Sequence, residues 1–350
     1  MIQIKVPARI CFYGDHQDYL GLPVIAGAID RFIHISASPI SENKFVLHLQ
    51  DLGKQMSIDL DDDLATVQPG DFFRSGMAVL KERGFRYDQG YSITISGDIP
   101  VNAGLSSSSA LLVGWIRFLV AINDKSDEIS DFQIGRWAYE AEVVFFDAPG
   151  GLMDQYTIAQ RGMLYIDTKS GTSERLQGSI GKLLVAESGL AKKTLEVLKN
   201  ASVFAKKAVE AVKKANSRFV LEEAALDDYQ KYREFVPEEF QDYWYAAIHN
   251  YHITLQAKTE LKKAETNLQY LGKLMNAHQQ ILQDQIQNTP KEMVSMMDSA
   301  RKAGAIGAKT IGSGGGGCMV AMVDDENMEK VKEAFLEAGA KSVYEVEISY

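Results

Sequence analysis

The stretch that decides the fold is Ile99-Pro-Val-Asn-Ala-Gly-Leu-Ser-Ser-Ser-Ser-Ala110. It follows an alternating, strand-like run at 91–97 and precedes an apolar run at 111–122 with helical character. A Gly/Ser-rich turn that opens a helix presents unpaired backbone N–H groups and the positive end of the helix dipole, which suits a phosphate. Four serines exceed what one helix cap requires. The turn therefore predicts phosphate binding by Gly104, Leu105, Ser106, Ser107, Ser108 and Ser109.

The composition is that of an ordinary folded protein with an acidic balance. The chain has 350 residues, 46% hydrophobic and 24% charged, with a formal net charge of −10. An acidic chain is a poor partner for nucleic acid, which attracts basic surfaces. Two cysteines far apart in sequence give no metal spacing or disulfide framework, and no apolar run is long enough for a membrane span. These features predict a cytoplasmic protein that binds neither nucleic acid nor membrane.

The order of predicted elements changes near residue 183. Strand patterns precede it at 32–37, 45–49 and 163–167, with helices at about 104–122 and 130–145. Helical patterns follow at about 191–215, 219–234, 238–262 and 264–287, then from Asn288-Thr-Pro290 with a threonine cap. Strands return at 308–312, 318–323 and 342–348, around a helix at 326–338. We therefore predict an α+β fold, with a β-rich N-terminal lobe (1–182), a helix-rich C-terminal lobe (183–350) and a cleft between them.

Three further segments carry polar groups that suit chemistry. Arg9, Asp15, His16 and Asp18 lie within ten residues after an apolar strand pattern, and such groups can converge on the hydroxyls of a small ligand. A charged turn is the alternative interpretation of this cluster. Asp154 follows a helical pattern that ends at Asp147-Ala-Pro-Gly-Gly. Its carboxylate can accept a hydroxyl proton and orient an oxygen nucleophile, although a helix-start acid is the ordinary alternative.

The last segment is rich in glycine. Five of the six positions from Gly312 to Gly317 are glycines, and they lie between two strand patterns. Glycine permits positive φ and close approach of the backbone to a ligand. A flexible hairpin turn is the other interpretation.

The four segments together resemble the GHMP kinases, and within them the galactokinases, in order and spacing. The serine turn matches the pattern Pro-x-x-x-Gly-Leu-x-Ser-Ser at Pro100, Gly104, Leu105, Ser107 and Ser108. The galactokinase signature Gly-Arg-x-Asn-Leu-Ile-Gly-Glu-His-x-Asp-Tyr is matched at Arg9, Gly14, His16, Asp18 and Tyr19, with Ala8 and Asp15 as departures. The string around Asp154 resembles Gly-Ile-Met-Asp-Gln-Phe, and Gly314 to Cys318 resembles the end of the third motif.

The resemblance implies transfer of the γ-phosphoryl group of ATP to the anomeric hydroxyl of galactose or a close relative. It implies catalytic roles for Asp154 and Arg9, and sugar binding by Asp15, His16, Asp18, Tyr19 and Gly151. Gly314 and Gly315 would join the serine turn at the nucleotide, and Ser108 and Glu142 would hold Mg²⁺. One hydroxyl and one carboxylate suffice for an ion that keeps water and phosphate ligands. The partners expected are therefore a sugar and ATP, for a monomer or homodimer.

Several alternatives stay open. The acceptor can be galacturonate, a 6-deoxy or pentose sugar, or mevalonate. The acid at Asp15 disfavours a C6 carboxylate through like-charge repulsion, and the His-x-Asp-Tyr match disfavours mevalonate. A non-catalytic sensor of sugar and ATP is disfavoured because Ser108, Glu142 and Asp154 are all present. A purely structural module leaves the polar clusters without a purpose.

Overall fold

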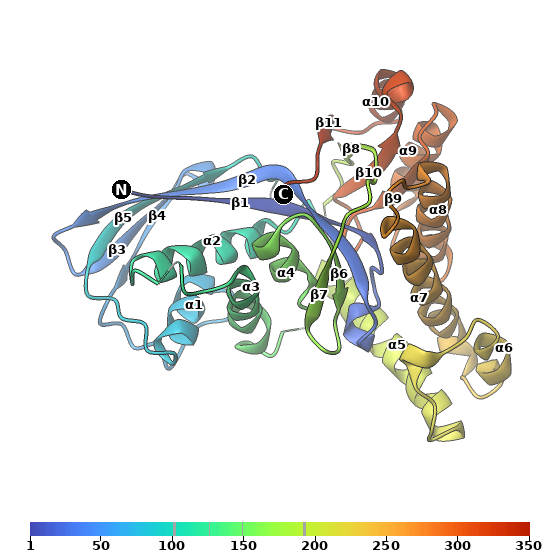
Figure 1. The fold of residues 1–350 in the computed structure, drawn as a ribbon, viewed down its shortest axis with the longest axis horizontal. Coiled ribbons are helices and arrows are strands. Elements are labelled where there is room, and N and C mark those ends of the chain that lie inside the picture. The colour runs from blue at the N-terminus through green and yellow to red at the C-terminus, as the bar shows by residue number, and fades with distance from the viewer. Residues whose placement is uncertain (101–102, 126, 149, 192–193) are drawn as a thin grey trace.

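A large, mainly antiparallel sheet organises the N-terminal region (Figure 1). The computed structural model describes residues 1–350 apart from 101–102, 126, 149 and 192–193. Among the described residues the sheet has seven strands, six of them in the order β4 (Lys54–Asp59), β3 (Lys44–Leu49), β5 (Gly90–Gly97), β2 (Val24–Ile40), β6 (Met163–Asp167) and β7 (Thr172–Leu176). The seventh, β1 (Ile2–Tyr13), pairs antiparallel with β2, whereas β3 and β5 pair in parallel.

Helices cover one face of this sheet (Figure 1). They are α1 (Phe72–Lys81), α2 (Ser107–Ala121), α3 (Asp131–Tyr139) and α4 (Met153–Gln160). Helix α2 is apolar almost all round because it lies between β1 and β2 on one side and the other three helices on the other. Trp115 and Phe118 of α2 are fully buried in this layer. The first residues of α2 are therefore fixed in place at the edge of a rigid core.

The C-terminal region combines a smaller sheet with long helices (Figure 1). Its antiparallel strands follow the order β11 (Ser342–Val346), β8 (Lys182–Glu187), β10 (Cys318–Val323) and β9 (Gly307–Thr310). The helices are α5 (Thr194–Ala215), α6 (Asp228–Arg233), α7 (Gln241–Leu261), α8 (Leu268–Asp284), α9 (Lys291–Lys302) and α10 (Met328–Glu337). Helix α8 packs on β9, and the main hydrophobic core runs without interruption from β1 to α8 and β10.

The predicted α+β architecture is confirmed, with β-rich and helix-rich regions in the predicted order, and the strand at 163–167 agrees with β6. Two local predictions are wrong. The stretch 219–234 forms only a short 3-10 turn at Leu221–Glu223 and the helix α6, because its aromatic side chains pack around Trp244 instead of continuing one helix. No threonine caps α9: the hydroxyl of Thr289 donates to Asn288 Oδ1.

The sequence patterns also missed helix α1, and the helix predicted over 130–145 changes form within its length. Helix α3 ends at Tyr139 and continues as a π-helical turn at Glu140–Val144. The lobe boundary at 182/183 stays a prediction, and it coincides with the start of β8. Across the described residues, no helix combines the length and the apolar character needed to cross a membrane.

Candidate active site

One cavity of about 750 Å³ gathers most of the predicted site residues. Those that line it are Arg9, Asp15, His16, Asp18, Tyr19, Gly104, Ser106, Ser107, Ser108, Ser109, Glu142, Gly151 and Asp154. Four further lining residues come from the C-terminal region: Ser202 and Lys206 of α5, and Gly312 and Ser313 of the glycine-rich loop. The cavity thus joins segments that are up to three hundred residues apart in the chain.

The serine turn adopts a backbone that few residues tolerate. Gly104 has φ +94°, and Ser106, the residue before α2, has the left-handed conformation with φ 59°. The Ser106 side chain makes no capping hydrogen bond to the helix. Its hydroxyl instead donates to Asp154 Oδ2 at 2.5 Å. The turn therefore places Ser106 against the carboxylate of Asp154 across the cavity. It also leaves the unpaired backbone N–H groups at the amino end of α2 beside the cavity.

Asp154 is held by a two-pronged ion pair with Arg9. Arg9 Nε donates to Asp154 Oδ1 at 2.6 Å and Nη2 donates to Oδ2 at 2.9 Å, while Nη1 binds the carbonyl of Gly104 at 2.7 Å. Burial lowers the pKa of Arg9, but the interactions with Asp154, together with smaller ones from Cys11 and Asp15, outweigh burial and the pKa is raised overall. A bidentate arginine fixes both the position and the plane of a carboxylate. Asp154 is therefore presented to the cavity in one orientation.

Glu142 lies in the π-helical turn and faces the serine turn. Its Oε1 accepts from Ser108 Oγ at 3.1 Å, and its Oε2 accepts from Gln155 Nε2 at 2.6 Å. Burial raises the pKa of Glu142, although the hydrogen bonds from Gln155 and Ser109 oppose the rise. π-Helical turns often occur at functional sites because the extra residue changes the direction of the side chains. Here the turn brings a carboxylate within reach of a hydroxyl on α2.

Asp18 packs directly against Gly151 at the other end of the cavity. A Cβ atom added to Gly151 would lie 2.0 Å from Asp18 Oδ2, so only glycine leaves room for this carboxylate. Asp18 Oδ1 accepts from the backbone N–H of Tyr19 at 3.0 Å. Burial, and then the charge of Asp154, raise the pKa of Asp18 to about 6. The carboxylates of Asp18 and Asp154 thus lie close enough for their charges to repel each other.

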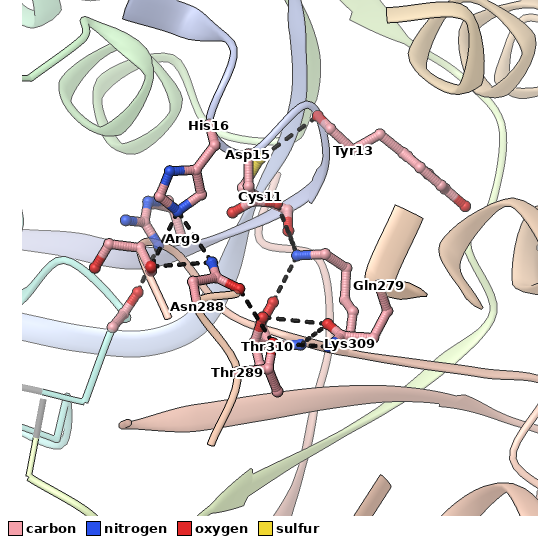
Figure 2. Close-up of polar contacts among 12 residues, drawn as sticks. Arg9, Cys11, Tyr13, Asp15, His16, Gln279, Asn288, Thr289, Lys309 and Thr310 are labelled. Carbon is pink, nitrogen blue, oxygen red and sulfur yellow. Dashed lines mark hydrogen bonds and ion pairs between the residues drawn. The ribbon is translucent and has the colours of Figure 1, made fainter. Parts of the chain in front are cut away.

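Asp15 and His16 are tied to the C-terminal region (Figure 2). Lys309 of β9 donates to Asp15 Oδ2 at 2.8 Å. The ring of His16 contacts the carbonyl of Ser313 and the side chain of Asn288, each at 3.0 Å. Sequence reasoning identified neither Lys309 nor Asn288, because one lies in a plain strand pattern and the other next to a helix start. Ser202 and Lys206 were missed likewise, since serine and lysine are common on an exposed helix.

Three predicted nucleotide residues do not line the cavity. Leu105 is fully buried in the core beneath the serine turn. Gly315 donates its N–H to the carbonyl of Asn288 at 2.6 Å, and a Cβ on Gly314 would lie 2.5 Å from that same oxygen. These glycines therefore let the loop pack closely on the chain itself, while Gly312 and Ser313 reach the cavity.

Comparison with known proteins agrees with this geometry. Residues 72–162 match the GHMP kinases N terminal domain, and residues 257–341 match the GHMP kinases C terminal model. A galactokinase of Exiguobacterium sibiricum is 30% identical over 98% of this chain and 88% of its own length. A mevalonate kinase of Methanocaldococcus jannaschii is 26% identical, with 97% and 96% covered.

The fold agrees with solved structures as well. The structure of Lactococcus lactis galactokinase complexed with galactose has a TM-score of 0.86 at 21% identity, and the match covers 99% of this chain and 93% of that one. The structure of the Methanococcus jannaschii mevalonate kinase has a TM-score of 0.74 at 21% identity, covering 100% and 98%. Both family models and a relative at 30% identity agree, so this chain belongs to the GHMP kinases and is a phosphotransferase with an alcohol group as acceptor.

Proposed function

We propose that the protein is an ATP-dependent sugar kinase that phosphorylates the anomeric hydroxyl of galactose or a close relative. The observation that carries the proposal is the arrangement around Asp154. Its carboxylate is fixed by Arg9 and Ser106 between the serine turn and the Asp18–Gly151 contact. An acceptor hydroxyl at Asp154 would therefore lie between a phosphate-binding turn and a group of acids that suits sugar hydroxyls.

In this mechanism Asp154 accepts a hydrogen bond from the acceptor hydroxyl and aims its oxygen at the γ-phosphorus. Arg9 holds the carboxylate in place through the ion pair and balances its charge. The amino end of α2 and the hydroxyls of Ser107 and Ser108 face the phosphates. Phosphoryl transfer needs little covalent help from the protein, so positioning and electrostatics supply most of the rate gain.

The pair Ser108 and Glu142 fits a magnesium ion. Their oxygens are 3.1 Å apart, both face the cavity, and Gln155 fixes the far oxygen of the carboxylate. Among the described residues, no cluster of three or more His, Cys, Asp or Glu side chains offers a fuller metal site. A magnesium ion completed by water and phosphate oxygens needs no more than this, and when bound it neutralises charge on the phosphates.

The acceptor end favours a neutral polyol. This end is lined by Asp15, Asp18 and Tyr19, whose side chains can accept hydrogen bonds from hydroxyls or donate hydrogen bonds to them. Lys309 offsets the charge of Asp15, so repulsion by Asp15 alone is a weaker argument against a carboxylate acceptor than the sequence suggested. Among the described residues, Asp18 has no such partner cation, and its charge opposes an anionic acceptor.

Mevalonate is the second candidate acceptor because a mevalonate kinase is similar over nearly the full chain. Two observations support the sugar. The relative at 30% identity is a galactokinase, whereas the mevalonate kinase is 26% identical. The cluster from Asp15 to Tyr19 also offers more hydrogen-bonding groups than mevalonate requires, since beside its reacting hydroxyl it has only one other hydroxyl and a carboxylate.

A panel of acceptors with Mg-ATP tests the proposal by ADP release. It includes galactose, galactosamine derivatives, galacturonate, fucose, arabinose and mevalonate. Phosphorylation at the anomeric carbon removes the reducing end, so a reducing-sugar assay should fall in step with ADP formation. ADP release with the reducing end intact would contradict the anomeric site. Turnover of mevalonate alone, or binding of sugar and ATP without turnover, would overturn the proposed function.

A further inference from the structure

Lys309 is a buried cation immediately outside the cavity. Its side chain is 0% exposed, and it is absent from the residues that line the cavity. An ammonium group out of water is costly unless every donor finds a partner. Lys309 Nζ meets this need by donating to the carbonyl of Cys11 at 3.0 Å, the carbonyl of Thr310 at 2.6 Å and Asp15 Oδ2 at 2.8 Å (Figure 2).

These bonds fix one oxygen of Asp15 and leave the other for a ligand. The Asp15 side chain is 2% exposed, yet the residue contributes to the cavity wall. Its Oδ1 is buried and has no hydrogen-bond partner among the described residues. A buried carboxylate oxygen without a donor is unusual in a folded protein and calls for a partner. A hydroxyl that enters this end of the cavity would supply one.

The charge that keeps Asp15 ionised comes from Lys309. Burial raises the pKa of Asp15, but the interactions with Lys309, His278 and His16 together outweigh burial, and the pKa is lowered overall. His278 of α8 lies nearby, and burial followed by the charge of Lys309 lowers its pKa to about 3, so it stays neutral. The Lys309 strand is itself fixed, since Thr310 donates its N–H to Gln279 Oε1 on α8 at 2.9 Å.

We propose that Lys309 is the positioning residue for Asp15 and thereby sets the affinity for the acceptor from outside the cavity. This rests on the proposed function, since it assumes an acceptor that offers a hydroxyl to Asp15. Lys309 lies three residues before Gly312, where the glycine-rich loop reaches the cavity. The acceptor end is thus built from the N-terminal turn and the C-terminal strand together. Removal of either Lys309 or Asp15 should therefore weaken binding of the acceptor and leave binding of ATP unchanged.

The test compares Lys309→Met, Asp15→Asn and the double variant, using the acceptor that the panel identifies. Lys309→Met should raise the acceptor KM by about tenfold or more, because a charge-assisted hydrogen bond is lost, with the ATP KM within about twofold. The double variant should regain the thermal stability lost in Lys309→Met, since an amide carries no uncompensated charge. Its acceptor KM should stay high, because the carboxylate is absent. If Lys309 had a merely structural role, the thermal stability and the acceptor KM of the double variant would both recover.

A comparison within the Asp15→Asn background keeps the test decisive if Lys309→Met does not fold. Lys309 acts through Asp15, so its removal in the Asp15→Asn background should leave the acceptor KM within about twofold. A larger change there, or an unchanged KM in folded Lys309→Met, overturns the proposal. Lys263→Met is the control: Lys263 pairs with the buried carboxylate of Glu260 away from the cavity, and its loss should leave both KM values unchanged.

Failure of the proposed function would be seen separately. If the wild-type protein phosphorylates no acceptor, the Lys309–Asp15 pair can still be tested by NMR of ¹³C-labelled protein. The carboxyl signal of Asp15 is followed as the pH changes, and it is assigned by its absence in Asp15→Asn. The titration should shift to higher pH in Lys309→Met, because the compensating cation is lost. A titration that does not move would reject Lys309 as the positioning residue, whatever the enzyme phosphorylates.

Discussion

Gly151→Ala should disable the acceptor site without disturbing the nucleotide site. The new Cβ would lie 2.0 Å from Asp18 Oδ2 and 2.8 Å from its Cγ. Since real Cβ atoms essentially never approach another heavy atom closer than 3.0 Å, the carboxylate must move by about 1 Å. Gly151 does not have positive φ, so the change adds no backbone strain and the effect comes from Asp18. A displacement of this size at a reacting centre costs up to about 100-fold in kcat/KM.

The assay is steady-state ADP release with each substrate varied in turn. We expect kcat/KM for the acceptor to fall by about 10- to 100-fold, while the ATP KM stays within about twofold. Gly150→Ala is the matched control, because a Cβ there would lie 3.4 Å from Val143, an ordinary contact. A folded Gly151→Ala enzyme with wild-type acceptor kinetics would refute the placement of Asp18 at the acceptor. An equal fall in kcat/KM for the acceptor and for ATP would indicate a wider structural change.

Three further predictions concern the carboxylates. Asp154→Asn should lower kcat by about 100-fold or more while ATP binding, measured by calorimetry, is retained; near-normal turnover would remove Asp154 from its role. Glu142→Gln should raise the Mg²⁺ concentration for half-maximal activity by about tenfold, and an unchanged magnesium titration would contradict the assignment. Because the pKa of Asp18 is raised to about 6, it is ionised above that pH and protonated below. Acceptor affinity, measured by calorimetry without ATP, should therefore weaken as pH falls through about 6, and Asp18→Asn should abolish this dependence.

The local elements were largely predictable because their patterns are local. Alternation of apolar residues was enough to find β6 at Met163–Asp167, and the apolar run after the serines was enough to find α2. The stretch at 219–234 was not, since the ring of Phe219 packs against the rings of both Tyr232 and Trp244 and these contacts do not follow helical spacing. Helical periodicity reports which face is apolar, and it does not report how a segment turns around a neighbour.

Within the site, the serine run likewise has features that the local sequence predicts and others that depend on tertiary contacts. Its composition predicted a phosphate-binding turn, and its spacing cannot distinguish the serines. In the folded chain Ser106 binds Asp154, Ser108 binds Glu142 and Ser109 is buried. The left-handed φ of Ser106 separates the directions of these side chains. Their different partners lie 34 and 48 residues away, on elements whose placement depends on the whole sheet and its helices.

The sequence by itself determined the family, the order of β-rich and helix-rich regions, and about half of the residues that line the cavity, because motifs and periodicities are properties of short segments. Only the tertiary structure decided which residues act on one another. Lys309 and Asp15 are 294 residues apart, and nothing in either segment marks them as partners. They meet because α8 fixes β9 beneath the end of β1, where a buried cation and a buried carboxylate each need the other.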